Sequence, residues 1–219
     1  WCNEKIQTQP DSLAINLALL NLYRLSEEYN KALVYVDHCI RLTTDNEQTN
    51  ALYCLNKANI LQMAFNKTGD KEYLKKAIQE NESILQKQPT NSTVLNNLAY
   101  ALADTGMDVS KALVYAKRAY EILPGNPNVL DTYGYVLLKN GNAKQADEVL
   151  QKARQQFEQD RMYAPAEVYE HIGLTKEKLG QDAEALTAYK RFLELADENV
   201  SKNVKDRVSA SVERLSSGK

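Results

Sequence analysis

The sequence predicts an all-α fold, an alpha-alpha superhelix of about five helix-turn-helix repeats with a C-terminal capping helix. The first observation is a series of alanines, each early in the second helix of an expected pair, at Ala32, Ala77, Ala112, Ala146 and Ala185. Their spacings are 45, 35, 34 and 39 residues, which indicates a repeat unit of 34 residues with insertions. The second is the position of Gly106, Gly141 and Gly180, five or six residues before the last three alanines, where the chain must turn between helices. The third is a low content of helix-breaking residues, 8 Gly and 5 Pro among 219 residues.

Each expected element follows from apolar residues that recur three and four positions apart, bounded by capping and turn residues. The expected repeats cover residues 11–46, 47–90, 91–125, 126–163 and 164–198. Their helices are expected at 13–25 and 29–42, 49–65 and 73–87, 92–104 and 109–122, 127–140 and 143–160, and 164–179 and 182–196.

Two repeats depart from the regular length, and both ends of the chain need a separate interpretation. The second repeat carries an insertion, the polar connection NKTGDKE, and the fourth has an extended second helix. Residues 1–10 end in Pro10, where a repeat closes, so we expect them to be the end of a preceding, truncated repeat helix. Over residues 199–216, Val200, Val204, Val208 and Val212 form one apolar stripe on a polar helix. A stripe of this kind is what a helix needs to cover the last repeat.

The pattern of large apolar, small and aromatic residues resembles that of tetratricopeptide repeats. The fourth repeat carries Leu130, Tyr133-Gly134, Leu137, Gly141, Ala146, Leu150 and Ala153. The third carries Leu95, Leu98-Ala99, Leu102, Gly106, Ala112, Ala116, Ala119 and Pro124. The fifth carries Tyr169, Ile172-Gly173, Gly180, Ala185, Tyr189 and Phe192. The resemblance covers residues 13–197, and the wording of LNNLAYALAD and PGNPNVLDTYGYVLLKNG is similar to bacterial members of the family.

Composition argues against several classes of function. The net charge is −2 with both signs interspersed, and no Lys/Arg cluster is interleaved with aromatics, so nucleic acid is not an expected partner. No apolar run approaches the roughly 18 to 20 residues that a membrane span needs, so membrane insertion is not expected. The two histidines, His38 and His171, have no partners at ligand spacing, and no phosphate loop or nucleophile motif stands out. We therefore expect no metal, no cofactor and no enzyme activity, and we expect both histidines to be structural or surface residues.

The three cysteines are Cys2, Cys39 and Cys54, an odd number with no metal-ligand spacing. Cys39 occupies a small-residue packing position, and Cys54 lies in an apolar stretch of the next helix. Buried free thiols are the expected state. A bridge between Cys39 and Cys54 remains open at this point, since only their geometry decides it.

The family resemblance implies that the first helix of each pair lines a concave groove and that its variable positions contact a partner. Carried over residue by residue, the expected groove residues are Asn96, Tyr100, Asp131, Tyr135, Lys139, Glu167 and Glu170. Asn amides and Tyr rings suit a peptide lying in the groove, and the glutamates favour a basic or polar segment. The alternative is that Asn96, Tyr100 and Tyr135 pack between neighbouring first helices and that the glutamates are only a solvated face.

The sequence thus predicts a protein–protein interaction scaffold that binds a peptide or partner protein along the concave groove. Two alternatives stay open. One is a recruiting or regulatory repeat region of a larger enzyme or of an envelope or polysaccharide-export assembly. The other is a self-association module, a homodimer through its repeat ends. The compartment is left open between bacterial cytoplasm and the periplasm or cell envelope.

Overall fold

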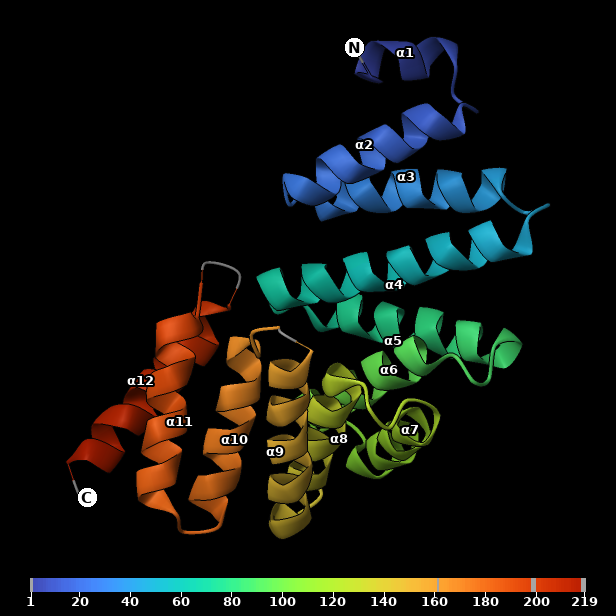
Figure 1. Ribbon diagram of the computed structural model, residues 1–219. Coiled ribbons are helices and arrows are strands. Elements are labelled where there is room, and N and C mark those ends of the chain that lie inside the picture. The colour runs from blue at the N-terminus through green and yellow to red at the C-terminus, as the bar shows by residue number, and fades with distance from the viewer. Residues whose placement is uncertain (1, 161, 198–199, 218–219) are drawn as a thin grey trace. The chain divides into compact units, whose positions relative to one another are not determined.

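The computed structural model describes residues 2–160, 162–197 and 200–217, and in these ranges it contains twelve α-helices and no strand (Figure 1). The all-α fold class is therefore confirmed. Trp1 of the expected N-terminal segment, Arg161 and Glu198 of the fourth and fifth repeats, and Asn199 at the start of the expected capping helix lie outside the described residues. The chain divides into two compact units, Trp1–Pro89 and Thr90–Lys219.

The first unit is a succession of helices, each packed on the next. It consists of α1 (Cys2–Thr8), α2 (Leu13–Leu25), α3 (Tyr29–Leu42), α4 (Glu47–Thr68) and α5 (Lys71–Lys87). Its core lies among α2, α3 and α4 and contains Leu20, Tyr29, Ala32, Val36, Cys39, Tyr53, Ile60 and Ala64. Cys39 is buried there as a free thiol, and Cys54 is free as well. The disulfide between them is therefore absent.

The insertion in the second repeat lengthens the helices and does not form a loop. The sequence predicts a polar connection over 66–72, whereas α4 continues to Thr68 and α5 already begins at Lys71. Gly69 ends α4 in the left-handed conformation, with φ of 71°, which costs glycine little. Asp70 then caps α5, because its side chain accepts a hydrogen bond from the Glu72 amide at 2.9 Å. Two adjacent caps thus reduce the connection to two residues.

The second unit contains three helix pairs and a final helix. They are α6 (Ser92–Thr105) with α7 (Val109–Ile122), α8 (Pro127–Lys139) with α9 (Ala143–Gln159), α10 (Ala166–Lys178) with α11 (Asp182–Leu195), and α12 (Lys202–Ser216). The first helices α8 and α10 also contact the helices before them, so that α8 touches α6, α7, α9 and α10. The first helices α6, α8 and α10 therefore lie side by side in this order.

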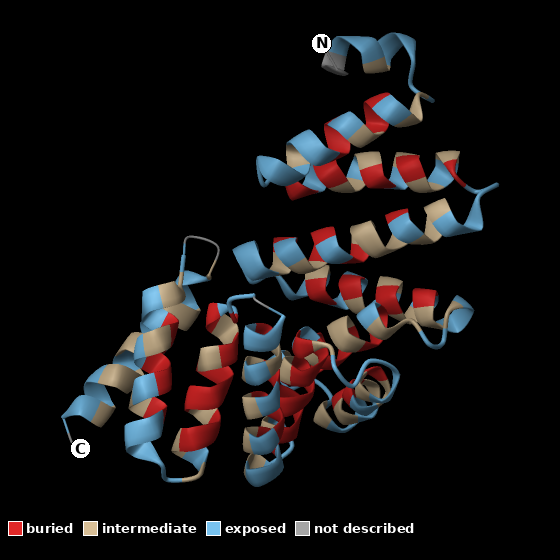
Figure 2. Cartoon of the chain, in the orientation of Figure 1, coloured by how far each residue is buried: buried red, intermediate tan, exposed pale blue. Residues whose placement is uncertain are grey.

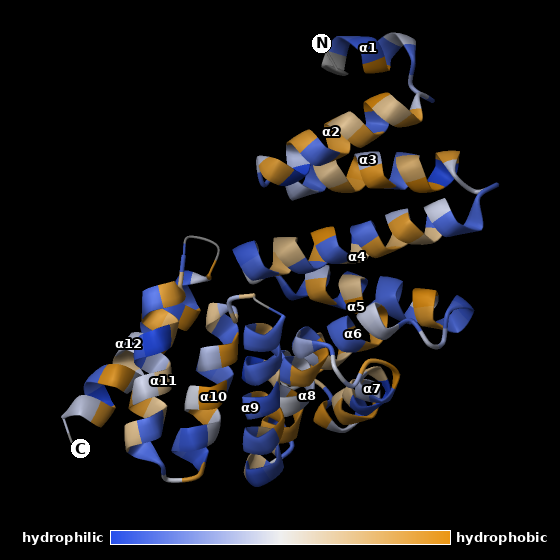
Figure 3. Ribbon diagram, in the orientation of Figure 1, coloured by the Kyte–Doolittle hydropathy of each residue, from blue (hydrophilic) through white to orange (hydrophobic). Residues whose placement is uncertain are grey.

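The first helices of the unit are more deeply buried than the second helices, because they contact more neighbouring helices. Nine of the 13 residues of α8 are buried, against five of the 17 residues of α9 (Figure 2). Figure 3 shows the same contrast in hydropathy, since the side of α9 in view is mostly hydrophilic. A helix in contact with four others has little surface left for water, whereas a second helix exposes its outer side. Polar groups on α8 and α10 are consequently the ones that need partners inside the protein.

The helix α12 packs on the last pair through its apolar stripe. Val208 is buried beside Tyr189 and Phe192 of α11, and around them pack Val200, Val204, Val212 and Leu215. Ser201 begins the helix by accepting a hydrogen bond from the Val204 amide. This packing is the capping role that the valine periodicity predicts.

Candidate functional site

Three aromatic rings from the first helices of the second unit form a stack. The Tyr135 ring of α8 lies on the His171 ring of α10, with centroids 4.1 Å apart and planes 20° apart. The Tyr100 ring of α6 lies beside both, 5.6 Å from Tyr135 and 6.3 Å from His171 between centroids. The stack therefore connects three successive repeats through side chains up to 71 positions apart in the sequence.

Two carboxylates bind the polar atoms of this stack. The Tyr135 hydroxyl donates to Asp104 Oδ1 of α6 at 2.9 Å. His171 Nδ1 lies 2.9 Å from Asp131 Oδ1 of α8. Each bond joins one first helix to its neighbour, so the polar groups fix the spacing of α6, α8 and α10 as the rings do.

The electrostatics of the stack favour a charged imidazole and neutral phenols. Burial by itself lowers the pKa of His171, but the charge and hydrogen bond of Asp131 and the charges of Glu170 and Glu167 raise it above its usual value. Burial and the charge of Asp104 raise the pKa of Tyr100 and of Tyr135 far above neutral pH. The raised pKa favours the protonated ring of His171 beside Asp131, and both tyrosines keep their hydroxyl protons.

A cation from another part of the chain completes the site. Glu170 of α10 is 4% exposed, and its carboxylate pairs with the guanidinium of Arg207 on α12. Further along the same two helices, Arg214 of α12 pairs with Glu177 of α10 at 2.7 Å. The Lys139 ammonium lies 5.1 Å from the centroid of the Tyr135 ring, within range of a cation–π interaction.

The structure brings most of the expected groove residues to this one region but buries several of them. Tyr135 is 3% exposed and Glu170 is buried, so Glu170 is not part of a solvated face. Tyr135 packs between first helices, as the alternative interpretation predicts, while Tyr100, Asp131, Glu167 and Asn96 are half-buried and Lys139 is exposed. The Asn96 amide oxygen is buried with no hydrogen-bond partner within the described part of the chain.

Sequence reasoning does not foresee the roles of His171 and Arg207. The sequence predicts His171 as a structural or surface residue, and it is structural, a buried ring stacked on Tyr135. Two signals in the sequence could have indicated the role of His171. It directly follows Glu170, and a carboxylate or amide recurs at the equivalent groove positions of three repeats. Arg207 carries no such signal, because the repeat period does not extend to α12.

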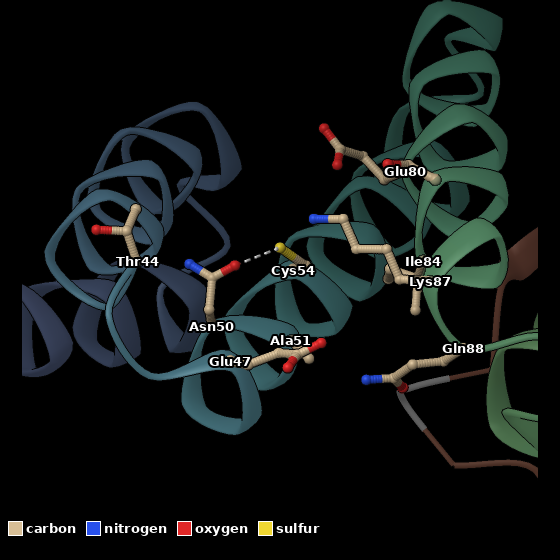
Figure 4. Close-up of a pocket in the computed structure, with 10 residues that line it drawn as sticks. Thr44, Glu47, Asn50, Ala51, Cys54, Glu80, Ile84, Lys87 and Gln88 are labelled. Atoms are coloured by element: carbon tan, nitrogen blue, oxygen red, sulfur yellow. Dashed lines mark hydrogen bonds between the residues drawn. The ribbon is translucent and has the colours of Figure 1, made fainter.

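A pocket of about 360 Å³ lies in the first unit, between α4 and α5. Figure 4 shows Lys87 of α5 reaching across it toward Cys54 and Asn50 of α4, with Glu80 above and Glu47 below. The Cys54 thiol is 3.8 Å from Asn50 Oδ1, and burial, followed by the charge of Glu80, raises its pKa. A thiol that stays protonated is a weak nucleophile, so the pocket offers no activated group.

Neither region has the make-up of a metal centre or a membrane segment. In the residues that the structure describes, no three His, Cys, Asp or Glu side chains gather so that they could hold a metal ion. None of the helices described combines the length and the apolar character needed to cross a membrane.

Comparison with known proteins identifies the repeat. Residues 107–167 match one sequence model described as "Tetratricopeptide repeat", and residues 166–199 match a second with the same description. Residues 107–199 are therefore tetratricopeptide repeats. The TPR repeat-containing protein PA4667 of Pseudomonas aeruginosa is 25% identical over 172 residues, which cover 78% of this chain and 26% of that protein. The chain therefore spans about a quarter of the length of this curated relative.

Solved structures of tetratricopeptide-repeat proteins share the fold. TTC0263, a thermophilic TPR protein of Thermus thermophilus, superposes with a TM-score of 0.65 at 18% identity, covering 92% of this chain and 99% of that one. The Cut9-Hcn1 hetero-tetramer of the APC/C gives 0.73 at 16% identity, over 97% of this chain and 39% of that one. YrrB, described as a TPR protein with an unusual peptide-binding site, gives 0.55 at 18% identity over 90% and 93%. Likeness at these identities shows the fold.

Proposed function

We propose that this tetratricopeptide-repeat chain is a protein-interaction scaffold, not an enzyme, and that its second unit binds a segment of a partner protein. The proposed binding surface is the acidic aromatic face, which consists of Tyr100, Asp104, Asp131, Tyr135, Glu167, Glu170 and His171 on α6, α8 and α10. Tyr135, Glu170 and His171 are its buried floor. The observation that carries the proposal is the stack of Tyr100, Tyr135 and His171, which joins three successive repeats into one surface. A segment that lies across three first helices then meets a preorganised surface.

The charges of the face favour a basic partner. Four carboxylates, those of Asp104, Asp131, Glu167 and Glu170, lie around the rings. Against them stand the Arg207 guanidinium, the Lys139 ammonium and the His171 ring, whose raised pKa favours its charged form. The excess is negative, and complementary charge on the partner speeds association and selects against acidic segments.

Two polar groups on α6 add hydrogen-bonding capacity. The Tyr100 hydroxyl keeps its proton because burial and nearby carboxylates raise its pKa, so it can donate to a partner carbonyl. The Asn96 amide oxygen has no donor in the described structure, so its capacity to accept a hydrogen bond is unused. Both groups suit a peptide backbone, which offers a donor and an acceptor at each residue.

A selection from a random peptide library displayed on phage tests the proposal. We expect enrichment of sequences with Arg or Lys, and affinities that fall as salt rises. Glu167→Lys on α10 should weaken the selected peptides at least fivefold. Glu148→Lys on α9 is the matched control, since it makes the same charge reversal on the exposed side of a second helix and should leave affinity unchanged. Equal loss in both variants, or enrichment of acidic peptides, would place the binding surface elsewhere.

A further inference from the structure

The helix α12 makes two separate kinds of contact with the last helix pair. Its apolar stripe, centred on Val208, packs on α11 and accounts for its position. Its arginines, Arg207 and Arg214, instead reach to the glutamates of α10. Because the stripe already holds the helix, the arginine contacts are not needed for capping and call for a separate explanation.

Glu170 is the more demanding of the two glutamates. Its side chain is buried beside the Tyr135–His171 stack, whereas Glu177 is about a third exposed. A buried carboxylate needs a cation or hydrogen-bond donors, since it has lost its water. Arg207 supplies that cation from outside the repeats.

The Arg207 side chain is well placed to be displaced. It remains 55% exposed although its guanidinium pairs with a buried carboxylate. Burial alone would lower the pKa of Arg207, but the hydrogen bond and charge of Glu170, and then the charge of Asp104, raise it. The guanidinium thus lies at the edge of the acidic aromatic face, near carboxylates of α6 and α10, on a side chain that is more than half exposed.

We propose that Glu170, together with Asp104 and Tyr135, forms an arginine-binding subsite of the acidic aromatic face, and that Arg207 occupies it until an arginine of the partner replaces it. This inference rests on the proposed function and specifies its partner chemistry and its regulation. The helix α12 is then an internal competitor, which lowers the affinity of every arginine-bearing segment by holding the subsite closed.

The geometry favours arginine over lysine as the ligand. A guanidinium is planar, forms parallel bonds to a carboxylate and stacks on aromatic rings, whereas an ammonium is a compact and strongly hydrated charge. The subsite joins a buried carboxylate to an aromatic stack, so it suits a guanidinium better than an ammonium. The occupant that the chain itself provides is an arginine.

Methylguanidinium is the probe that tests the subsite without a partner, with methylammonium as the comparison. In Arg207→Gln, methylguanidinium should raise Tm by a few degrees, more than methylammonium does, because it refills the vacated subsite. Arg214→Gln is the matched control, since it removes an arginine of the same helix that pairs with the same helix α10, and like the unsubstituted chain it should show no such rise. Adding Glu170→Gln to Arg207→Gln should abolish the response. A rise of the same size in all the proteins, or no rise in Arg207→Gln, would overturn the subsite.

The selected peptides test the competition. An arginine-bearing peptide should bind Arg207→Gln about tenfold more tightly than the unsubstituted chain, and its Arg→Lys form should gain less. Arg207→Lys keeps the charge and the apolar stripe, so its affinity for the arginine-bearing peptide should lie between those of the unsubstituted chain and Arg207→Gln. It replaces Arg207→Gln in the test if that variant loses helicity. If peptides bind through Glu167 but neither variant tightens them, the competition is wrong and the proposed function stands. If methylguanidinium acts as expected but no peptide is selected, the proposed function fails while the subsite remains.

Discussion

Replacing Gly173 by alanine would test the close packing that positions the helix carrying Glu170 and His171. Gly173 lies in the middle of α10, and a Cβ atom built on it would be 2.4 Å from Cε1 and 2.5 Å from Cδ1 of Tyr189 on α11. Real Cβ atoms do not approach ring carbons so closely, so either the ring or the helix must move. Because Tyr189 is 1% exposed and packs against Phe192 and Val208, its ring has no free space to enter.

The expected loss of stability follows from two opposing terms. Overpacking a well-filled core costs about 1–3 kcal/mol, and a rigid buried ring favours the upper end, about 3 kcal/mol. Alanine gains about 1 kcal/mol over glycine in a helix interior. The net destabilisation is therefore about 2 kcal/mol. For a chain of this length each 1 kcal/mol lowers Tm by roughly 2–4 °C, which gives a fall of about 4–8 °C.

The assay is urea and thermal unfolding followed by circular dichroism, with two companion variants. Gly125→Ala is the control, because Gly125 has no atom within 4 Å of a Cβ and no left-handed backbone requirement, so it should change little. Tyr189→Leu removes the ring, and the double variant Gly173→Ala/Tyr189→Leu should recover at least about 1 kcal/mol relative to additivity. A neutral or stabilising Gly173→Ala, or strict additivity in the cycle, would refute the close approach of α10 to α11.

Three further predictions address buried ionisable groups. Asp131, Glu170 and Glu167 raise the pKa of His171 in the folded state, so the stability that protonated His171 contributes should be complete below about pH 6.5 and be lost as pH rises through the folded pKa. Over that pH range Tm of the unsubstituted chain should fall relative to Tm of His171→Gln, and parallel curves of Tm against pH would contradict this. Lys176 is buried on α10 and pairs with Asp147 and Glu184 at 2.9 and 2.8 Å. Lys176→Met should therefore lower the free energy of unfolding in urea by about 1–2 kcal/mol, less than the loss of a fully buried pair would, because both carboxylates are partly exposed. An unchanged urea midpoint would show that the two ion pairs do not stabilise the fold. Burial raises the pKa of the Cys39 thiol to about 11, so iodoacetamide at neutral pH should modify it only after unfolding, and rapid labelling of the native chain would contradict its burial.

Most of the fold follows from signals that are local in the sequence. Pro127 at the first turn of α8 and the left-handed Gly106 and Gly180 define helix ends wherever they occur. The predicted loop after α4 is wrong although Gly69 and Asp70 are standard capping residues, because polar residues around them resemble a loop in composition. Hydrophobic periodicity is weak across α4, so capping chemistry, not polarity, decides where such a helix ends.

The candidate site is predictable only as far as the repeat register extends. Tyr100 and Tyr135 are one repeat apart, so their shared face follows from the sequence. The exposure of the two tyrosines cannot be predicted from the sequence in this way, because it depends on His171 of the next repeat, which covers Tyr135. The bond between Arg207 and Glu170 joins residues 37 positions apart, one of them outside the repeats, and no period sets the register of α12 along α10.

The acidic aromatic face already satisfies its most buried charges, and this limits how a partner can gain affinity from it. Replacing the Arg207–Glu170 pair by an equivalent pair with a partner arginine exchanges one contact for another, so the net gain at that point is small. Affinity must then come from the half-buried groups, Asp131, Glu167 and Tyr100, whose remaining surface is free to be covered. Selectivity, in contrast, arises at Glu170, because a segment without an arginine has two unfavourable options. It can leave Arg207 in place and bind beside it, or it can displace Arg207 and leave the buried Glu170 carboxylate unpaired. In the proposed function, Arg207 therefore adds more to selectivity among basic segments than Glu170 adds to their affinity.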